Sequence, residues 1–162
     1  MHAFDFANPQ SVPDAVGLLQ KHGDRARVLA GGTDVIVQLR EGRRSADLVV
    51  DIKEIPDVNV LSYSATTGAK IGAAVPCYRI YGNEEIAGAY PGIMDAASLV
   101  GGIAVQGRAS LGGNLCNASP AADTIPTMIV HSAVCTVAGP SGTRQVAVED
   151  FCTGPGRNVL ES

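Results

Sequence analysis

Two glycine pairs, Gly31-Gly32 and Gly112-Gly113, are the sequence feature that most limits what this chain can fold into. The first pair follows the short apolar run Val28–Leu29 and precedes apolar residues at helical spacing, and the second is flanked by hydrogen-bonding side chains. Glycine leaves backbone N–H groups uncovered, so both segments suit close contact with an anion such as a pyrophosphate. We therefore predict glycine-rich loops at Ala30–Asp34 and Ser110–Asn114 that close on one phosphate pair from opposite sides.

Composition and charge exclude several classes of function. The chain has 162 residues, of which 46% are hydrophobic and 17% charged, so it can bury a core. Its net charge of −4 and its lack of a basic run argue against nucleic-acid binding, since Arg43–Arg44 is its densest basic patch. No apolar stretch approaches the roughly 20 residues that span a bilayer, and residues 1–5 lack the charged-then-apolar pattern of a signal peptide. We expect a cytoplasmic protein.

The cysteines argue against a metal centre in this chain. None of them belongs to a C-x-x-C pair, so neither a zinc ribbon nor a self-contained iron–sulfur cluster is expected. Free thiols in a reducing compartment are the simplest interpretation. The four residues are Cys77, Cys116, Cys135 and Cys152.

The first 55 residues have a β-α-β-α-β pattern. Phe4 and Phe6 alternate with polar neighbours, as in a short strand. A helix is predicted from the Ser11 cap to Gly23, and Leu48–Ile52 reads as a buried strand. Because Ile55-Pro56 follows this strand, we place one lobe at residues 1–55 and a second at residues 56–162.

The second lobe is predicted to mix hairpins and helices. Two β-rich stretches, Val58–Ser64 and Ala69–Ala74, are separated by turn residues and predict a hairpin. Further expected elements are helices near Pro76–Ile86, Pro91–Val100 and Thr124–Val130, and a hairpin of Ala133–Ala138 with Arg144–Val148. The fold class is therefore α+β, with one glycine-rich segment in each lobe.

Each glycine-rich segment has an ordinary interpretation when it is taken alone. A Gly-Gly pair is commonly a plain turn, and Ser119-Pro120 followed by Asp123 is commonly a helix start. The chain has no Gly-Lys-Ser/Thr of a phosphate loop and no G-x-G-x-x-G of a dinucleotide-binding βαβ unit. The residues alone therefore leave a flavin site and two structural turns both open.

The two segments together resemble a known family. Val28–Asp34 looks like the first flavin loop of the FAD-binding subunits of molybdenum hydroxylases, the group of xanthine dehydrogenase and the carbon monoxide dehydrogenase medium subunit. Ser110–Asp123 is similar to the second loop over fourteen consecutive residues, and the similarity runs from Phe4 to the end. Many members carry Gln-Ile-Arg-Asn before the second loop, and this chain departs from that pattern with Val105–Arg108.

The resemblance implies a fold and a binding site. The fold is the two-lobed FAD-binding domain of the vanillyl-alcohol-oxidase-like (PCMH) type, here without the family's C-terminal domain. Asp123 would hold the ribityl side of the flavin. The other residues implied for FAD binding are Leu29, Ala30, Gly31, Gly32, Thr33, Asp34, Ser110, Gly112, Gly113 and Asn114.

The resemblance also implies partners. The FAD subunit of this family takes electrons from [2Fe–2S] clusters in a small subunit and passes them to NAD or another acceptor, while a large subunit carries the molybdenum cofactor. No catalytic or metal-binding residue is expected in this chain, because the cofactor performs the redox chemistry. Two alternatives stay open: a stand-alone flavin reductase of the same fold, and a non-catalytic truncated interaction module.

Overall fold

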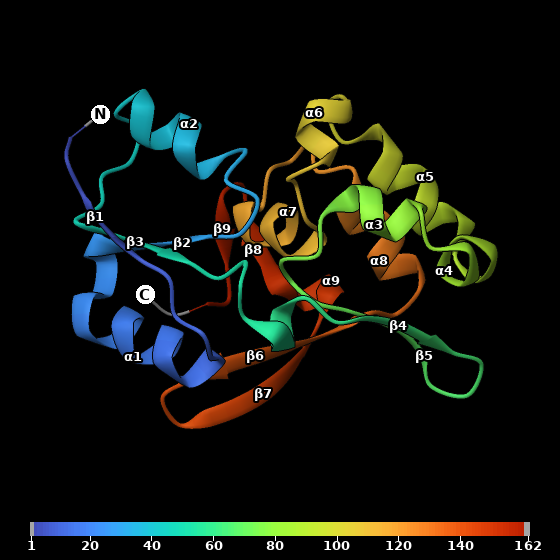
Figure 1. Ribbon diagram of the computed structural model, residues 1–162. Helices are drawn as coiled ribbons and strands as arrows, with labels where there is room; N and C mark the ends of the chain where they lie inside the picture. The colour runs from blue at the N-terminus through green and yellow to red at the C-terminus, as the bar shows by residue number, and fades with distance from the viewer. Residues whose placement is uncertain (1, 161–162) are drawn as a thin grey trace.

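The computed structural model describes residues 2–160 and mixes helices with strands, as expected for an α+β chain. In Figure 1 a small sheet with two helices occupies one side of the molecule, and most of the helices occupy the other. We refer to residues 2–55 as the N-terminal part and to residues 56–160 as the C-terminal part. No helix among the described residues has the length and apolar character needed to cross a membrane.

The N-terminal part is built on a parallel sheet. Its strands are β1 (Asp5–Ala7), β2 (Ala26–Leu29) and β3 (Leu48–Asp51), and β3 lies between the other two. Every residue of β3 is buried, because helices cover both faces of the sheet. This explains why Leu48–Val50 is a continuous apolar run that shows no alternation.

The two helices of the N-terminal part pack on opposite faces of this sheet (Figure 1). Helix α1 (Val12–His22) packs against a core that contains Leu48 and Val50, whereas α2 (Val35–Arg40) packs against Val49. This division follows the two-residue period of a strand. A short 3₁₀ turn, η1 (Gly23–Arg25), connects α1 to β2.

Local signals fix the ends of α1. The Ser11 hydroxyl accepts a hydrogen bond from the backbone N–H of Asp14 at 3.2 Å, and the Asp14 carboxylate accepts one from that hydroxyl at 2.6 Å. Gly23 follows the helix with a φ of 52°, which is unfavourable for residues with a side chain. The sequence-based prediction of this helix is confirmed.

The C-terminal part begins with a 3₁₀ turn and a hairpin. These are η2 (Pro56–Val58), β4 (Leu61–Ser64) and β5 (Gly68–Ile71), and the two strands pair antiparallel. The helical pattern predicted at Pro76–Ile86 is two helices, α3 (Cys77–Tyr81) and α4 (Glu84–Ala89). They are separate because Asn83 caps α4, accepting a hydrogen bond from the Ile86 N–H at 2.9 Å. Helices α5 (Pro91–Leu99) and α6 (Ile103–Gln106) follow.

The second glycine pair lies in a helix, which corrects the prediction of a loop at Ser110–Asn114. Helix α7 (Leu111–Asn117) begins at the Ser110 cap and contains both glycines. Leu111 and Leu115, one turn apart, are both buried and anchor the helix in the core. The glycine pair is therefore the first turn of a helix whose packing face is set by its leucines.

The remaining elements complete the C-terminal part. They are α8 (Thr124–Val130), β6 (Val134–Gly139), β7 (Gly142–Ala147), α9 (Val148–Phe151), β8 (Cys152–Gly154) and β9 (Arg157–Asn158). Strands β6 and β7 form the second predicted hairpin, and β6 also contacts α1 of the N-terminal part. A separate core that includes Ile80, Ile86 and Phe151 holds these elements together.

Candidate functional site

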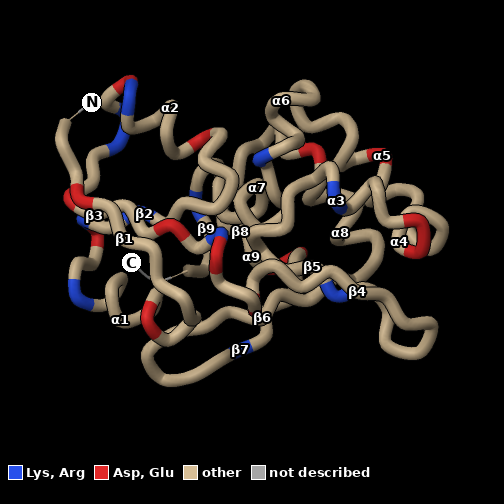
Figure 2. The backbone as a smooth tube through the Cα atoms, in the orientation of Figure 1, with Lys and Arg blue, Asp and Glu red and all other residues tan. Residues whose placement is uncertain are grey.

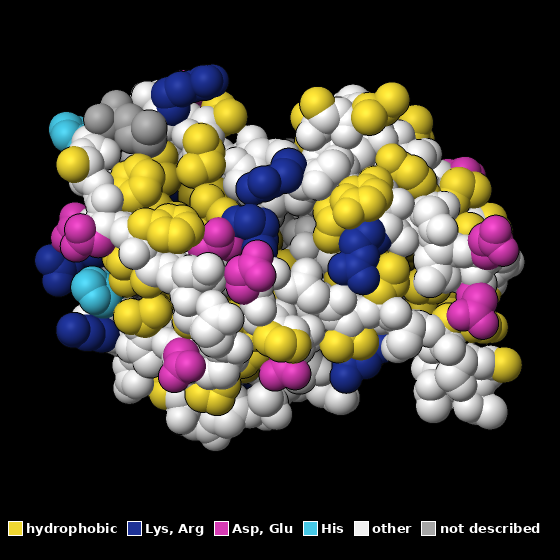
Figure 3. Space-filling model, in the orientation of Figure 1, with side chains coloured by type: hydrophobic (Ala, Val, Ile, Leu, Met, Phe, Trp, Pro, Cys, Tyr) yellow, Lys and Arg dark blue, Asp and Glu magenta, His cyan; other side chains and the backbone are white. Residues whose placement is uncertain are grey.

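A cleft of about 670 Å³ lies where the two parts meet, and both glycine-rich segments line it. The space-filling view shows the molecule hollowed between its two sides (Figure 3). Apolar side chains of Val28, Ile52 and Val100 form part of its wall. The cleft therefore combines glycine backbone with an apolar surface, as expected for a ligand that has both anionic and apolar groups.

Most of the residues singled out in the sequence lie together in this cleft. Leu29 does not line it, because its side chain is buried in the core between the sheet and α2. Asp123 does not line it either and is exposed just before α8. The residues that do line it are Ala30, Gly31, Gly32, Thr33, Asp34, Ser110, Gly112, Gly113 and Asn114.

The first glycine-rich segment, Ala30–Asp34, is a turn whose backbone N–H groups include free donors. Gly32 has a φ of 81°, a conformation that favours glycine. Among the described residues, no acceptor pairs with the backbone N–H of Gly31, Gly32 or Thr33. These donors line a cleft, so an anionic ligand placed there can satisfy them.

Gly31 also joins the two parts of the molecule. A Cβ atom at this position would lie 2.2 Å from the Arg108 carbonyl oxygen, so only glycine allows this close approach. The Arg108 Nε in turn donates a hydrogen bond to the Gly31 carbonyl oxygen at 3.4 Å. One glycine of the first pair therefore has a structural role, in which it brings the two segments into contact.

The second segment presents the first turn of α7. The Ser110 hydroxyl accepts a hydrogen bond from the Gly113 N–H at 3.1 Å, while the N–H group of Gly112 has no acceptor among the described residues. A Cβ on Gly112 would lie 2.6 Å from the Ala73 carbonyl oxygen, so Gly112 packs against backbone. A Cβ on Gly113 would meet only the Ser110 hydroxyl, at 3.1 Å, so Gly113 is the more open of the two.

Asn114 is oriented by a residue that sequence reasoning missed. The hydroxyl of Thr124, 1% exposed, donates a hydrogen bond to the Asn114 Oδ1 at 2.6 Å. Because the amide oxygen is engaged, the Asn114 amide N–H groups are left for a ligand in the cleft. Thr124 directly follows Asp123, so the predicted ligand contact Asp123 is next in the chain to the residue that orients Asn114.

Other cleft residues were also missed by the sequence analysis. Gln38 donates a hydrogen bond from Nε2 to the Asn117 Oδ1 at 3.1 Å and so connects α2 to α7. Three arginines, Arg27, Arg44 and Arg157, line the cleft as well. Arg44 belongs to the densest basic patch of the sequence, which is the one signal that pointed to it.

The cysteines of the described residues are all free thiols, as expected. Cys116 lines the cleft and Cys77 lies in the C-terminal core. Burial raises the pKa of the Cys77 thiol to about 11. Cys77 is therefore protonated at neutral pH and is a poor nucleophile. Within residues 2–160 no group of His, Cys, Asp and Glu side chains is arranged to hold a metal ion.

Comparison with protein families identifies the family of this chain. The model of the family described as the FAD binding domain in molybdopterin dehydrogenase matches residues 2–162. This chain belongs to that family. The resemblance inferred from Val28–Asp34 and Ser110–Asp123 is thereby confirmed, and FAD is the cofactor of the domain.

Relatives of the FAD-binding domain include several dehydrogenase subunits. The chain is 30% identical to the xanthine dehydrogenase FAD-binding subunit of Escherichia coli and 31% identical to the nicotinate dehydrogenase FAD-subunit of Eubacterium barkeri. These alignments cover 98% and 100% of this chain but only 55% and 56% of the relatives. The chain thus spans about half the length of the curated relatives it matches.

Solved structures of this family share the fold. The structure of reconstituted CO dehydrogenase from Oligotropha carboxidovorans matches with a TM-score of 0.94 at 30% identity, over 99% of this chain and 56% of the other. Quinoline 2-oxidoreductase from Pseudomonas putida matches with a TM-score of 0.93 at 27% identity, over 99% and 55%. The arrangement of the cleft therefore belongs to a fold that several oxidoreductases contain.

The residues of the cleft fit FAD. The free N–H groups of both segments suit its diphosphate, and the apolar wall suits its planar ring systems. Glycine at position 113 leaves the second segment open to a ligand. The fit rests on this chain's own geometry as well as on its family.

Proposed function

We propose that this chain is the FAD-binding part of a molybdenum-containing hydroxylase or dehydrogenase, and that it holds the FAD diphosphate between Gly31–Thr33 and the first turn of α7. The observation that carries the proposal is the set of unpaired N–H groups that face one cleft from both segments. The names of the relatives, xanthine, nicotinate and carbon monoxide dehydrogenase subunits, support the class of complex.

The residues of the chain act by binding and orientation. FAD supplies a redox centre when it is bound, and the protein supplies its position. Backbone donors of Gly31, Gly32 and Thr33 would hold one side of the diphosphate, and that of Gly112 the other. Asn114, oriented by Thr124, would add a side-chain donor.

Not all of the predicted site residues lie in the cleft. Thr33 and Ser110 line the cleft with hydroxyl groups, although the Ser110 oxygen already accepts from the Gly113 N–H. Asp123, which we still propose for the ribityl hydroxyls, lies outside the cleft, so that contact requires the ligand to extend toward α8. Leu29 would act from the core by supporting the loop.

The division into two FAD-binding lobes at residues 55 and 56 is part of the proposal. The buried core residues fall into separate clusters on the two sides of this boundary. Val58 is an exception, because it packs on the N-terminal cluster. A two-lobed domain of the PCMH type, with the cofactor between the lobes, accounts for this arrangement.

The proposed complex has two further subunits. A small subunit with [2Fe–2S] clusters would deliver electrons, a large subunit would carry the molybdenum cofactor, and NAD or another acceptor would receive the electrons. The names of the relatives describe FAD subunits and medium chains of dehydrogenases, which supports a multi-subunit assembly. We place it in the cytoplasm, where thiols stay reduced, consistent with the free cysteines of the described residues.

Flavin content and reduction test the proposal together. The purified chain, mixed with FAD and passed through a desalting column, is expected to retain about one FAD per chain, and Gly17→Val in α1 is expected to retain the same amount. A folded chain that retains none would contradict the proposal and favour a non-catalytic module. Reduction of the retained flavin by a reduced [2Fe–2S] protein is expected for the electron-transfer subunit. A flavin that NADH reduces but a reduced [2Fe–2S] protein does not would favour a stand-alone flavin reductase.

A further inference from the structure

Three arginines that no sequence pattern assigned to the site line the cleft. Arg27 comes from β2, Arg44 from the connection between α2 and β3, and Arg157 from β9. They therefore reach the same cleft from both parts of the molecule. Figure 3 shows Lys and Arg side chains within the hollow between the two sides.

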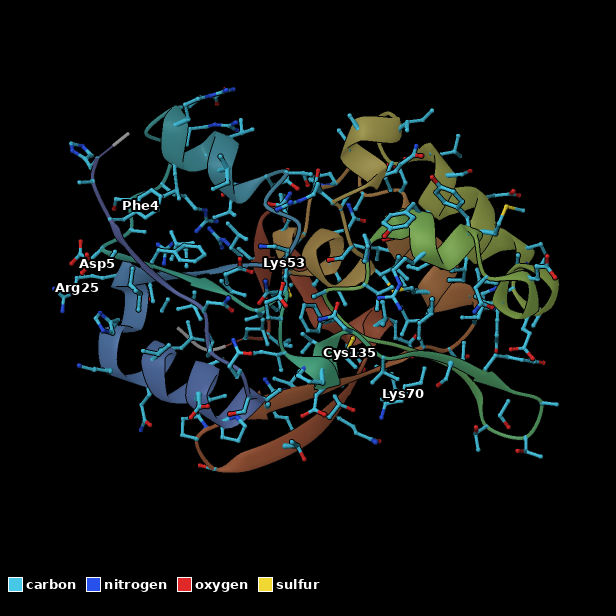
Figure 4. All side chains as sticks on the ribbon, viewed as in Figure 1. Phe4, Asp5, Arg25, Lys53, Lys70 and Cys135 are labelled. Atoms are coloured by element: carbon cyan, nitrogen blue, oxygen red, sulfur yellow. The ribbon has the colours of Figure 1, made fainter. Side chains whose placement is uncertain are left out.

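These arginines have no carboxylate partner among the described residues. The ion pairs within the described residues are Arg25–Asp47, Arg43–Glu41 and Lys53–Asp51. Lys53 lies between the two parts of the molecule in Figure 4, but its charge is already compensated by Asp51. The charges of the three cleft arginines are thus left without a counter-ion within the described residues.

The charge of the cleft is opposite to that of the whole chain. The chain has a net charge of −4, yet Asp34 is the only carboxylate among the residues that line the cleft. Three guanidinium charges and one carboxylate leave two net positive charges. A diphosphate diester carries two negative charges, so the cleft matches it in sign and number. Figure 2 shows acidic positions on α4 and α5, outside the cleft.

Arg27 is held in place before any ligand arrives. Its Nη1 donates to the carbonyl oxygens of Asp24 and Ala26, each at 2.7 Å. Its Nε is buried and has no hydrogen-bond partner among the described residues. A buried donor without an acceptor is costly, and a guanidinium fixed by its own backbone is pre-organised for an anion.

We propose that Arg27, Arg44 and Arg157 form a cationic clamp that neutralises the diphosphate of the bound dinucleotide. This inference rests on the proposed function, because it concerns the same cleft and ligand. It adds that affinity depends on side-chain charge and not on the glycine backbone alone. The clamp also selects for ligands with a diphosphate over a flavin that lacks one.

The clamp makes quantitative predictions for FAD binding. Because a hydrogen bond to a charged group is strong when buried and weaker when exposed, each Arg→Met change should weaken FAD binding roughly 5- to 30-fold. Arg27, the least exposed of the three, should have the largest effect. The affinity should fall as salt rises, since the charges are partly in contact with solvent. The triple Arg→Met variant should lose most of this salt dependence.

The test is a set of FAD titrations followed by flavin fluorescence, in 25 mM and 250 mM NaCl, with ADP as a competitor. Arg27→Met, Arg44→Met and Arg157→Met are compared with the corresponding Lys variants, which keep the charge. Arg25→Met is the control, because Arg25 lies at the outer edge of the sheet part and pairs with Asp47 (Figure 4). Circular dichroism checks that each variant is folded.

The outcomes separate the clamp from the proposed function. Weaker binding of both FAD and ADP in the Met variants, with recovery in the Lys variants and no change in Arg25→Met, is the expected result. If the Met variants bind FAD with the same affinity and salt dependence as the wild type, the clamp is overturned and the proposed function stands. A folded wild-type chain that binds no FAD would overturn both.

Discussion

Replacing Gly113 by valine should remove FAD binding without unfolding the chain. A Cβ at this position would meet only the Ser110 hydroxyl, at 3.1 Å, and no backbone. Glycine inside a helix is less favourable than alanine by about 0.5–1 kcal/mol, so a side chain here can even offset part of the strain against Ser110. We therefore expect the unfolding free energy to stay within about 1 kcal/mol of wild type.

The effect on FAD should be far larger. The branched side chain would occupy the approach to α7, where the Gly112 N–H is unpaired and the Asn114 amide N–H groups are left for a ligand. Loss of these two hydrogen bonds to a charged group, at about 1.5–3 kcal/mol each, corresponds to at least a 100-fold weaker affinity. The assay is FAD titration beside urea unfolding, both done on the same preparation.

Gly17→Val is the matched control for this variant. Gly17 is also a helical glycine, in α1, and a Cβ there meets nothing within 4 Å. It should change stability by a similar amount and leave FAD affinity unchanged. Normal FAD stoichiometry in Gly113→Val would refute the reasoning, because the first turn of α7 would then lie outside the site.

Three further variants test the packing around the cleft and in the C-terminal core. Gly31→Ala should lower the melting temperature by several degrees in a thermal scan, because its Cβ would lie 2.2 Å from the Arg108 carbonyl oxygen; an unchanged melting temperature would contradict this contact. Thr124→Val should lower the free energy of unfolding in urea by about 1–3 kcal/mol and weaken FAD binding, since it leaves the Asn114 oxygen without its donor. If neither quantity changes, Thr124 does not orient Asn114. Burial raises the Cys77 pKa from 9.0 to about 11, so the folded state holds the proton more tightly and stability should fall between pH 9 and 11. Cys77→Ala should flatten that fall, and an equally steep fall in the variant would assign it to other groups.

Where local signals decided the structure, the sequence was sufficient to predict it. The ends of α1 follow from Ser11, Asp14 and Gly23, which act within one turn of the chain. Strand β3 follows from its apolar run Leu48–Val50, because the strand is buried on both faces of the sheet. The pairs Gly31-Gly32 and Gly112-Gly113 could be placed on a ligand surface because the residues around them resemble the flavin loops of a known family.

The features that the sequence did not predict depend on contacts between residues that are far apart in the chain. The second glycine pair reads as a loop, but Leu111 and Leu115 give the segment a buried helical face that only the core defines. Gly31 could be expected to contact a ligand, yet its closest constraint is the Arg108 backbone 77 residues away. The cleft arginines share no motif, so only the folded chain brings them together.

The most direct test of the site is an amide NMR titration of the ¹⁵N-labelled chain with FAD. The account predicts that the N–H signals of Gly31, Gly32 and Thr33 and that of Gly112 shift together, at one FAD per chain, because both segments would hold the same diphosphate. Shifts in only one segment, or in residues outside the cleft, would contradict the claim that FAD binds between them.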